Sequence, residues 1–227
     1  MTETPVACAR RALDFVESGQ TLGLGTGRAA TAFVVELGRR VADGFRVRAV
    51  ATSEATAAVA REWSIPLLEL DEAGRLDVTI DGADEVDPQL EMIKGYGGAL
   101  VREKITAASS KRLVILVGPE KMVSRLGERG KLPVEVVPFG VGLCSARLRE
   151  LGCEPVLRQG ADGRPFLTDN GNPILDCRIG PLPDPAAFES QVLAIPGTVG
   201  TGLFVGMADV VIVDRESGPE VLERSRD

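Results

Sequence analysis

Short apolar segments alternate with helical patterns through the N-terminal half of the chain, and this alternation limits the fold more than any other feature. Strand patterns occupy residues 21–24, 46–51, 65–70, 76–80 and 112–117. Apolar residues at helical spacing occupy residues 5–17, 30–41, 55–63 and 99–108. Strands that alternate with helices across short polar links predict an α/β fold with a Rossmann-like, doubly wound, mostly parallel sheet.

The pattern changes after Gly130. Strands are predicted at 134–137, 154–158, 165–168, 173–177 and 199–205, and helices at 142–151 and 186–194. The turn Asp169-Asn170-Gly171 joins two of these strands. With the hairpin 165–177 counted as one strand position, the order reads as βαββαβ, a ferredoxin-like α+β pattern.

The predicted domains follow from this change. Residues 1–130 plus 206–227 form a Rossmann-like catalytic domain, and residues 131–205 form an inserted, ferredoxin-like α+β domain. The apolar run 208–213 is expected to return to the main sheet. Residues 217–227 are polar enough to fray or to form a short exposed helix.

The chain has no histidine. This excludes Ser-His-Asp and Cys-His nucleophiles, HExxH zinc sites and any proton shuttle built on imidazole. Acid–base chemistry near neutral pH must therefore use a carboxylate, a lysine, a cysteine or the single tyrosine, Tyr96.

Charge and cysteine content narrow the possible partners. The chain has 26 Lys+Arg against 33 Asp+Glu, a formal net charge of -7, which argues against a nucleic-acid partner. No apolar run approaches the length of a membrane span, and residues 1–5 show no signal-peptide pattern, so we expect a cytoplasmic protein with no membrane partner. The cysteines show no zinc spacing and are expected to be small, buried, reduced residues: Cys8, Cys144, Cys153 and Cys177.

A first glycine cluster spans residues 23–30. Gly25-x-Gly27-x-x-Ala30 satisfies the dinucleotide-binding fingerprint, but the second strand ends in Ala51-Thr52-Ser53-Glu54 rather than in the acid that holds a ribose. A small polar ligand therefore fits better, and Arg28 adds a cation where the helix dipole favours an anion. The alternative is a tight strand-to-helix turn without a ligand.

Acidic residues crowd the segment 81–88, directly after the fourth predicted strand. Ligands of open α/β sheets bind beyond the carboxyl ends of strands, which is where Asp81 is expected. The spacing does not match the calcium-loop pattern, so no metal is expected. The alternative is Asp-Gly turn chemistry in a solvated acidic loop.

A second glycine cluster, Lys94-Gly95-Tyr96-Gly97-Gly98, opens a helix and is another candidate anion cradle. On that helix, Val101, Ile105 and Ala108 share one face and Glu103 projects roughly opposite. Periodicity alone therefore predicts Glu103 to be an exposed surface residue. Lys121 follows the fifth strand on the expected ligand side, where a lone lysine is more often simply exposed.

The motifs together resemble the type A family of ribose-5-phosphate isomerases. The matching segments keep their order and spacing nearly from end to end: 23–30, 81–88, 93–105, 132–139, 168–177 and 196–213. The resemblance implies a cofactor-free interconversion of ribose 5-phosphate and ribulose 5-phosphate in the non-oxidative pentose phosphate pathway. Members of the family are commonly homodimers or homotetramers, so a homo-oligomer is expected.

The resemblance also implies residue roles. The glutamate at the position of Glu103 is the proton acceptor, and the implied ligand-binding residues are Thr26, Gly27, Arg28, Ala29, Asp81, Gly82, Ala83, Asp84, Lys94, Gly95, Tyr96, Gly97 and Lys121. This chain has Arg28-Ala29 where the family commonly has Ser-Thr, and Tyr96 where it has glycine. Arg28-Ala29 replaces two hydroxyl donors by one guanidinium group. The Tyr96 side chain either narrows the mouth of the pocket or lies on its rim without effect.

Isomerisation of an aldose to a ketose sets its own chemical requirements. One base takes a proton from C2 of an aldose and returns it to C1, through an enediolate whose charge must be stabilised. Glu103 would be that base, Lys94 and the glycine-loop N–H groups would stabilise the oxyanion, and Asp81 and Asp84 would handle the hydroxyl protons.

Three other classes of protein share parts of the pattern. A dinucleotide oxidoreductase is disfavoured by the missing acid after the second strand. A non-catalytic sugar-phosphate sensor would keep the phosphate loops without needing Glu103, but would normally carry a DNA-reading segment that this acidic chain lacks. Related sugar-phosphate deaminases depend on a histidine, and the chain has none.

Overall fold

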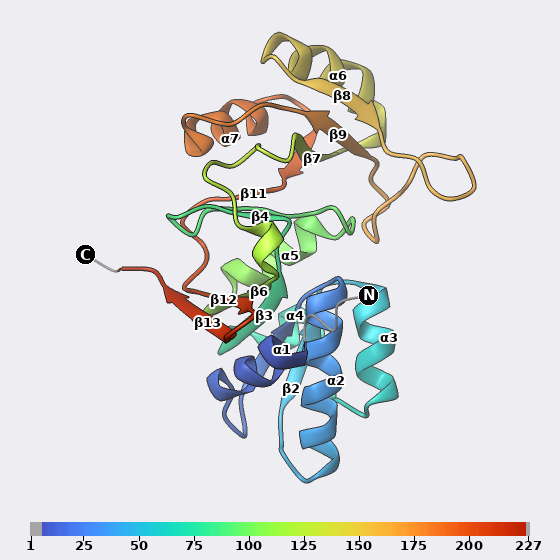
Figure 1. Ribbon diagram of the computed structural model, residues 1–227. Coiled ribbons are helices and arrows are strands. Elements are labelled where there is room, and N and C mark those ends of the chain that lie inside the picture. Colours follow the sequence, from blue (N-terminus) through green and yellow to red (C-terminus); the bar gives the residue numbers. More distant parts are fainter. Residues whose placement is uncertain (1–5, 226–227) are drawn as a thin grey trace. The chain divides into compact units, whose positions relative to one another are not determined.

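The computed structural model describes residues 6–225, which form two compact units (Figure 1). The first unit holds the described residues up to Ala83, together with Arg102–Met122 and the residues from Met207 onward. The second unit holds Asp84–Val101 and Val123–Gly206. Predictions that concern residues 1–5 and 226–227 lie outside the described residues.

A six-stranded sheet organises the first unit. In chain order its strands are β1 (Thr21–Leu24), β2 (Arg48–Ala51), β3 (Val78–Gly82), β6 (Leu113–Val117), β12 (Val210–Arg215) and β13 (Gly218–Glu223). They lie in the order β13-β12-β6-β3-β1-β2, and every neighbouring pair is parallel except β12 with β13. The predicted mostly parallel sheet is confirmed, including the return of the chain to it at β12.

Helices cover both faces of this sheet. The helical elements of the first unit are α1 (Val6–Ala12) with the 3-10 turn η1 (Leu13–Phe15), α2 (Arg28–Ala42), α3 (Glu54–Glu62), α4 (Leu70–Ala73), α5 (Leu100–Ala108), which begins in the second unit, and the 3-10 turn η2 (Pro119–Lys121). On one face, α1 and α2 pack over a core that includes Leu22, Phe33 and Ile80. On the other, Gly23 leaves room for Thr106 of α5, because a Cβ at Gly23 would lie 2.6 Å from the Thr106 methyl carbon.

Residues 65–70 do not form the predicted third strand. Only an isolated bridge between Ala49 and Leu67 links this segment to β2, and the chain then enters α4. Pro66 lacks an amide donor for a strand ladder, and a capping box between Glu69 and Glu72 starts a helix instead.

The C-terminal segment also differs from its prediction. Instead of a frayed end or a short helix, residues 218–223 form strand β13, paired antiparallel with β12 from Val210 to Arg215. Figure 1 shows this hairpin in red. Gly218, at φ +110°, supplies the left-handed turn conformation, and Val221 packs against the core, so the segment gains both a turn and an apolar anchor.

The second unit contains the predicted ferredoxin-like order. Its elements are β7 (Lys131–Val136), the 3-10 turn η3 (Pro138–Gly140), α6 (Val141–Glu150), β8 (Glu154–Leu157), β9 (Ile174–Arg178), α7 (Pro185–Leu193) and β10 (Thr198–Thr201). The strands lie in the order β10-β7-β9-β8 and are antiparallel throughout. The predicted strand at 165–168 is wrong, because the arms of this loop make only two isolated bridges, Gln159 with Pro165 and Leu167 with Pro173, and two prolines limit its donors.

A small three-stranded sheet in the second unit was not predicted. It pairs β4 (Glu85–Val86), β5 (Met92–Ile93) and β11 (Leu203–Phe204). The predicted strand 199–205 is therefore divided at Gly202, whose N–H donates to Pro133 of β7 while its carbonyl accepts from Lys94 after β5. A side chain at Gly202 would overlap the Lys94 carbonyl, so only glycine permits this crossing between two sheets.

The compact units and the domains predicted from sequence divide the chain differently. Residues 131–205 lie within the second unit as one block. That unit also contains residues 84–101, 123–130 and Gly206, which the sequence prediction placed with the Rossmann-like domain. The three-stranded sheet explains the grouping, since β5 hydrogen-bonds with β4 on one side and with β11 on the other.

Candidate active site

The turn after β1 is built around the carboxylate of Asp81. Asp81 is the penultimate residue of β3, is 1% exposed, and accepts hydrogen bonds at Oδ1 from the N–H groups of Thr26 (3.1 Å) and Gly82 (2.7 Å). Gly25 makes this approach possible, because a Cβ there would overlap the Asp81 carboxylate. The glycine that sequence assigned to a phosphate turn thus also makes room for a predicted catalytic acid.

Three hydroxyl groups hold the same turn from the side of α3, those of Thr52, Ser53 and Thr56. Thr26 Oγ1 lies 2.7 Å from Thr52 Oγ1 and donates to Ser53 Oγ at 2.8 Å, while Thr56 Oγ1 donates to the carbonyl of Gly25. Ser53 also caps α3 by accepting from the N–H of Thr56. The hydroxyl residues that follow β2 can be read from the sequence, but no local pattern marks the bond from Thr56 to Gly25, because the two residues are 31 positions apart.

The remaining predicted residues of the first turn lie at the N-terminus of α2. Gly27 caps the helix at φ +99°, and Arg28 follows as its first, exposed residue. Ala29 lies close to Gly82, where an added Cβ would be 3.7 Å from the Ala29 methyl group. This part of the site therefore joins a helix N-terminus, which favours anions, to the loop that carries Asp81.

Glu103 is buried, contrary to the expectation from helical periodicity. The side chain is 3% exposed, whereas Ile105, which the apolar spacing placed in the core, is 47% exposed. The buried side of α5 carries Leu100, Glu103 and Ala107, spaced by three and four residues. A glutamate that occupies a core position of a helix needs a chemical reason, because burial of a carboxylate is costly.

Lys121 closes the short turn η2 after β6 and is partly buried. Its position at the carboxyl end of a parallel strand is the one predicted from sequence. Asp81, near the end of β3, and Lys121, just after β6, therefore lie at the carboxyl ends of two neighbouring parallel strands.

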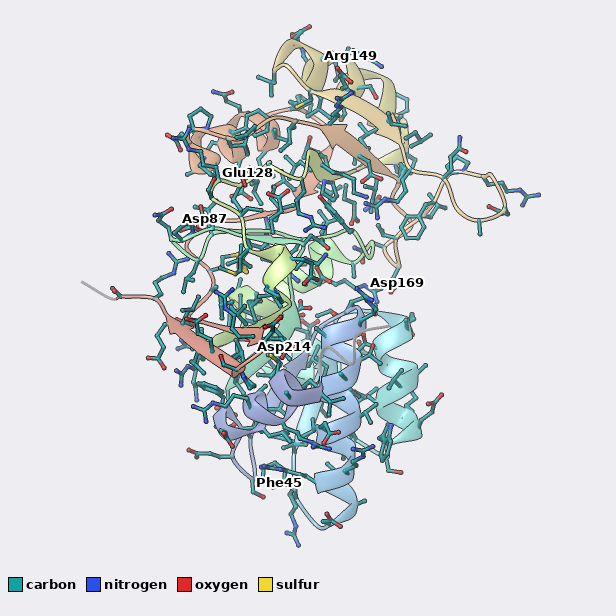
Figure 2. The ribbon with its side chains drawn as sticks, in the orientation of Figure 1. Phe45, Asp87, Glu128, Arg149, Asp169 and Asp214 are labelled. Carbon is teal, nitrogen blue, oxygen red and sulfur yellow. The ribbon has the colours of Figure 1, made fainter. Side chains whose placement is uncertain are left out.

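In the second unit, each acid of the segment after Asp81 binds main-chain N–H groups. Asp84 Oδ2 accepts from Tyr96 at 2.9 Å. Glu85 is fully buried and accepts from Gly127 and Arg129, and burial raises the pKa of its carboxyl group despite these two bonds. Asp87, labelled in Figure 2, accepts from Gln89 and Glu91 in the turn between β4 and β5. The segment is therefore a set of loop anchors rather than the solvated acidic loop of the simpler reading.

The glycine loop begins at Lys94, which is 3% exposed. Its main-chain N–H donates to Gly202, and its ammonium group lies 5.4 Å from the centre of the Phe204 ring. Gly95 at φ +99° and Gly98 at φ +88° give the loop its two left-handed residues. A Cβ at Gly95 would lie 2.8 Å from Leu100, so the loop closes tightly onto the start of α5.

Tyr96, the departure from the family pattern, uses its side chain for structure. Its hydroxyl donates to the carbonyl of Lys131 at 3.1 Å, and the ring packs against the core of the second unit, with Lys131 Nζ 4.1 Å from the ring centre. Burial, together with the carboxylates of Glu85 and Asp84, raises the pKa of the phenol. Neither sequence alternative, a narrowed mouth or a harmless rim, anticipated this anchoring role.

The described residues also bear on three broader features: metal ligands, membrane-spanning helices and cysteines. Among them, no group of three or more Cys, Asp or Glu side chains is placed to hold a metal ion. No helix in the described part of the chain combines the length and apolarity that crossing a membrane requires. All four cysteines are buried with free thiols, as the sequence predicted: Cys8, Cys144, Cys153 and Cys177.

Similarity to known proteins agrees with this architecture. Residues 48–218 match the family model for ribose 5-phosphate isomerase A (phosphoriboisomerase A). The ribose-5-phosphate isomerase A of Roseiflexus sp. (strain RS-1) is 54% identical over 214 residues, which cover 93% of this chain and 91% of that protein. That of Gloeobacter violaceus is 52% identical over 218 residues, covering 96% and 94%.

Solved structures give the same result. Ribose 5-phosphate isomerase A from Methanocaldococcus jannaschii superposes with a TM-score of 0.92 at 37% identity and covers 96% of this chain and 97% of its own. A D-ribose-5-phosphate isomerase in complex with phospho-erythronic acid gives a TM-score of 0.94 at 36% identity, with the same coverage.

Fold and similarity together define an isomerase of the α/β class. The chain belongs to the ribose-5-phosphate isomerase A family. The family expected from the motifs is thereby confirmed.

Proposed function

We propose that the protein interconverts D-ribose 5-phosphate and D-ribulose 5-phosphate through an enediolate, with Glu103 as the base. The observation that carries this proposal is the burial of Glu103, 3% exposed, on a helix whose periodicity would place it in solvent. In a chain without histidine, a desolvated carboxylate is the group best suited to exchange a proton with carbon near neutral pH. Glu103 takes the proton from C2 and returns it to C1.

The other predicted residues receive roles that fit their contacts. Asp81 and Asp84 exchange the hydroxyl protons and assist opening of the furanose ring, since main-chain donors already fix one oxygen of each. Lys94 and the N–H groups of Gly95, Tyr96 and Gly97 stabilise the enediolate oxyanion.

The phosphate group is assigned to the helix N-terminus at Thr26–Ala29. This placement rests on the left-handed cap Gly27 and on the cationic Arg28 next to it. Lys121, Gly82 and Ala83 complete the proposed ligand-binding set. The bound phospho-erythronic acid of the related isomerase supports a phosphorylated sugar acid or sugar as the ligand class.

The cellular setting follows from the same proposal. We place the reaction in the non-oxidative pentose phosphate pathway, without a cofactor, in a cytoplasmic homo-oligomer that is a dimer or a tetramer. The four free, buried thiols support a reducing compartment. Residues 1–130 plus 206–227 are proposed as the catalytic domain and 131–205 as the α+β domain.

The direct test is to incubate the purified protein with ribose 5-phosphate and to follow the appearance of the ketose by its absorbance or by NMR. Formation of ribulose 5-phosphate, with exchange of the C2 hydrogen for solvent deuterium, is the expected result. Binding of ribose 5-phosphate without turnover would instead favour the sensor alternative. Turnover that requires a nicotinamide cofactor would favour the oxidoreductase.

A further inference from the structure

A partly buried ion pair in the second unit reaches the glycine loop. Arg158 directly follows β8, and Asp176 lies in β9, paired in register with Val156. The guanidinium group binds both oxygens of the Asp176 carboxylate, from Nε at 2.9 Å and from Nη2 at 2.5 Å. The Arg158 side chain is 11% exposed. A two-point, largely desolvated pair of this kind fixes the position of the arginine.

The third nitrogen of Arg158 is directed at the loop. Nη1 donates to the carbonyl oxygens of Gly95 and Tyr96, each at 3.2 Å. The ring of Phe166 lies 5.6 Å from the guanidinium carbon and close to Gly98, where a Cβ would lie 2.5 Å from the Phe166 ring. The guanidinium group is therefore held by a carboxylate and an aromatic ring while it binds two successive peptide groups of the loop.

One of those peptide groups is held at both ends. The carbonyl of Gly95 accepts from Arg158, and the N–H of the same peptide unit, which belongs to Tyr96, donates to Asp84 Oδ2 at 2.9 Å. A cation on the carbonyl oxygen polarises the peptide and strengthens the hydrogen bond that its N–H makes. The next peptide unit is oriented in the same way, since its carbonyl belongs to Tyr96 and its N–H to Gly97, which is exposed.

We infer that Arg158 and Asp176 are a positioning pair for the isomerase reaction: through the Gly95–Tyr96 peptide they fix the carboxylate of Asp84 and aim the loop N–H groups. This inference rests on the proposed function, in which Asp84 and the loop act on the substrate. Neither residue touches the reacting atoms. Asp176 belongs to the 168–177 motif, for which the proposed reaction otherwise provides no role.

The test uses the substitutions Arg158→Lys and Asp176→Asn in the full-length chain. Lysine keeps the charge but cannot bind a carboxylate at two points and two carbonyls at once. The matched control is Arg178→Lys, at the end of β9, because Arg178 pairs with Glu154 at 3.7 Å and its side chain is 79% exposed. For each protein, kcat and KM for ribose 5-phosphate are measured together with the thermal midpoint.

A second readout reports on the hydrogen bond itself. Because Tyr96 is the only tyrosine, labelling with ¹⁵N-tyrosine gives a single amide resonance, that of the N–H bound to Asp84. We expect this resonance to move in Arg158→Lys and Asp176→Asn and to stay in place in Arg178→Lys. We expect kcat to fall about 10- to 100-fold in Arg158→Lys, with a smaller change in KM. This is the range found for residues that orient a functional group without contacting the substrate themselves.

Three outcomes would overturn the inference. The first is a kcat in Arg158→Lys within about twofold of the Arg178→Lys control. The second is a lowered kcat in Arg158→Lys with the Tyr96 resonance unmoved, and the third is a moved resonance with kcat unchanged. If Arg158→Lys does not fold, Asp176→Asn decides by the same criteria. Failure of the proposed function would appear differently, as absence of turnover in the unmodified protein, while the resonance would still test the geometry.

Discussion

The main-chain N–H of Thr26 donates to the carboxylate of Asp81 across 3.1 Å, and thereby ties the turn after β1 to the end of β3. The two residues are 55 positions apart in the chain. One connects to a helix N-terminus suited to a phosphate, and the other is a candidate acid for hydroxyl protons. A ligand whose phosphate binds beside Thr26 is therefore held at a fixed distance from the carboxylate of Asp81. Holding two reacting groups in place in this way raises their effective molarity.

Gly25→Ala should disrupt this arrangement. The new methyl group would overlap the Asp81 carboxylate and displace it from the Thr26 amide. We expect kcat/KM to fall about 100-fold, because displacements near 1 Å can cost that much. Steady-state kinetics provide the measurement. Gly142→Ala, whose added Cβ would meet nothing within 4 Å, is the control and should retain activity.

Glu103→Gln should remove the base while it preserves shape. We expect kcat to fall about 10²- to 10⁴-fold, the usual contribution of general base catalysis, with binding of ribose 5-phosphate retained in calorimetry. Glu62→Gln, at the exposed end of α3, should leave kcat unchanged. A Glu103→Gln protein within about tenfold of the unmodified protein would contradict the assignment of the base.

Glu135→Leu should destabilise the second unit. Glu135 is fully buried in β7, and its Oε1 accepts from the side chains of Thr168, Asn170 and Asn172. Leucine would remove the acceptor that these three donors share, so we expect a loss of about 2–4 kcal/mol in the free energy of unfolding. Urea denaturation measures it. Glu154→Leu, at an exposed position of β8, should change stability by less than about 0.5 kcal/mol, and equal losses in the two variants would refute the role of Glu135.

Asp77→Asn should show a stability difference that depends on pH. The hydrogen bond from Lys111, followed by that from the Thr21 amide, lowers the pKa of the Asp77 carboxyl group. A carboxyl whose pKa is lowered by folding stabilises the fold above its unfolded pKa of about 3.9, and this contribution disappears as pH falls through the folded value. The variant should therefore be less stable at neutral pH, and urea midpoints should converge with those of the unmodified protein in acid. A constant difference across pH would contradict this explanation.

The sequence predicts the sheet and the order of elements because apolar runs such as 113–117 have few alternative structures. It misplaces Glu103 because periodicity assumes that burial follows hydrophobicity, whereas α5 buries a carboxylate and exposes Ile105. Only the family resemblance pointed to Glu103.

Other features depend on contacts between residues far apart in the chain. The role of Gly202 depends on the carbonyl of Lys94, and that of Arg158 depends on the loop at Gly95. No local pattern marks either contact. Pro66 is different, because its missing donor could have been weighed against the strand predicted around it.

The three-stranded sheet of β4, β5 and β11 limits how this protein can be taken apart. The segment 131–205 looks like a module that could be excised or exchanged, but its end at Leu203–Phe204 is an edge partner of β5, next to Lys94. A shortened chain that replaced 131–205 with a linker would leave the Met92–Ile93 strand with β4 as its one remaining neighbour. Recombination between relatives should therefore tolerate crossovers that exchange 84–101 together with 123–206, and should reject those that exchange 131–205 alone.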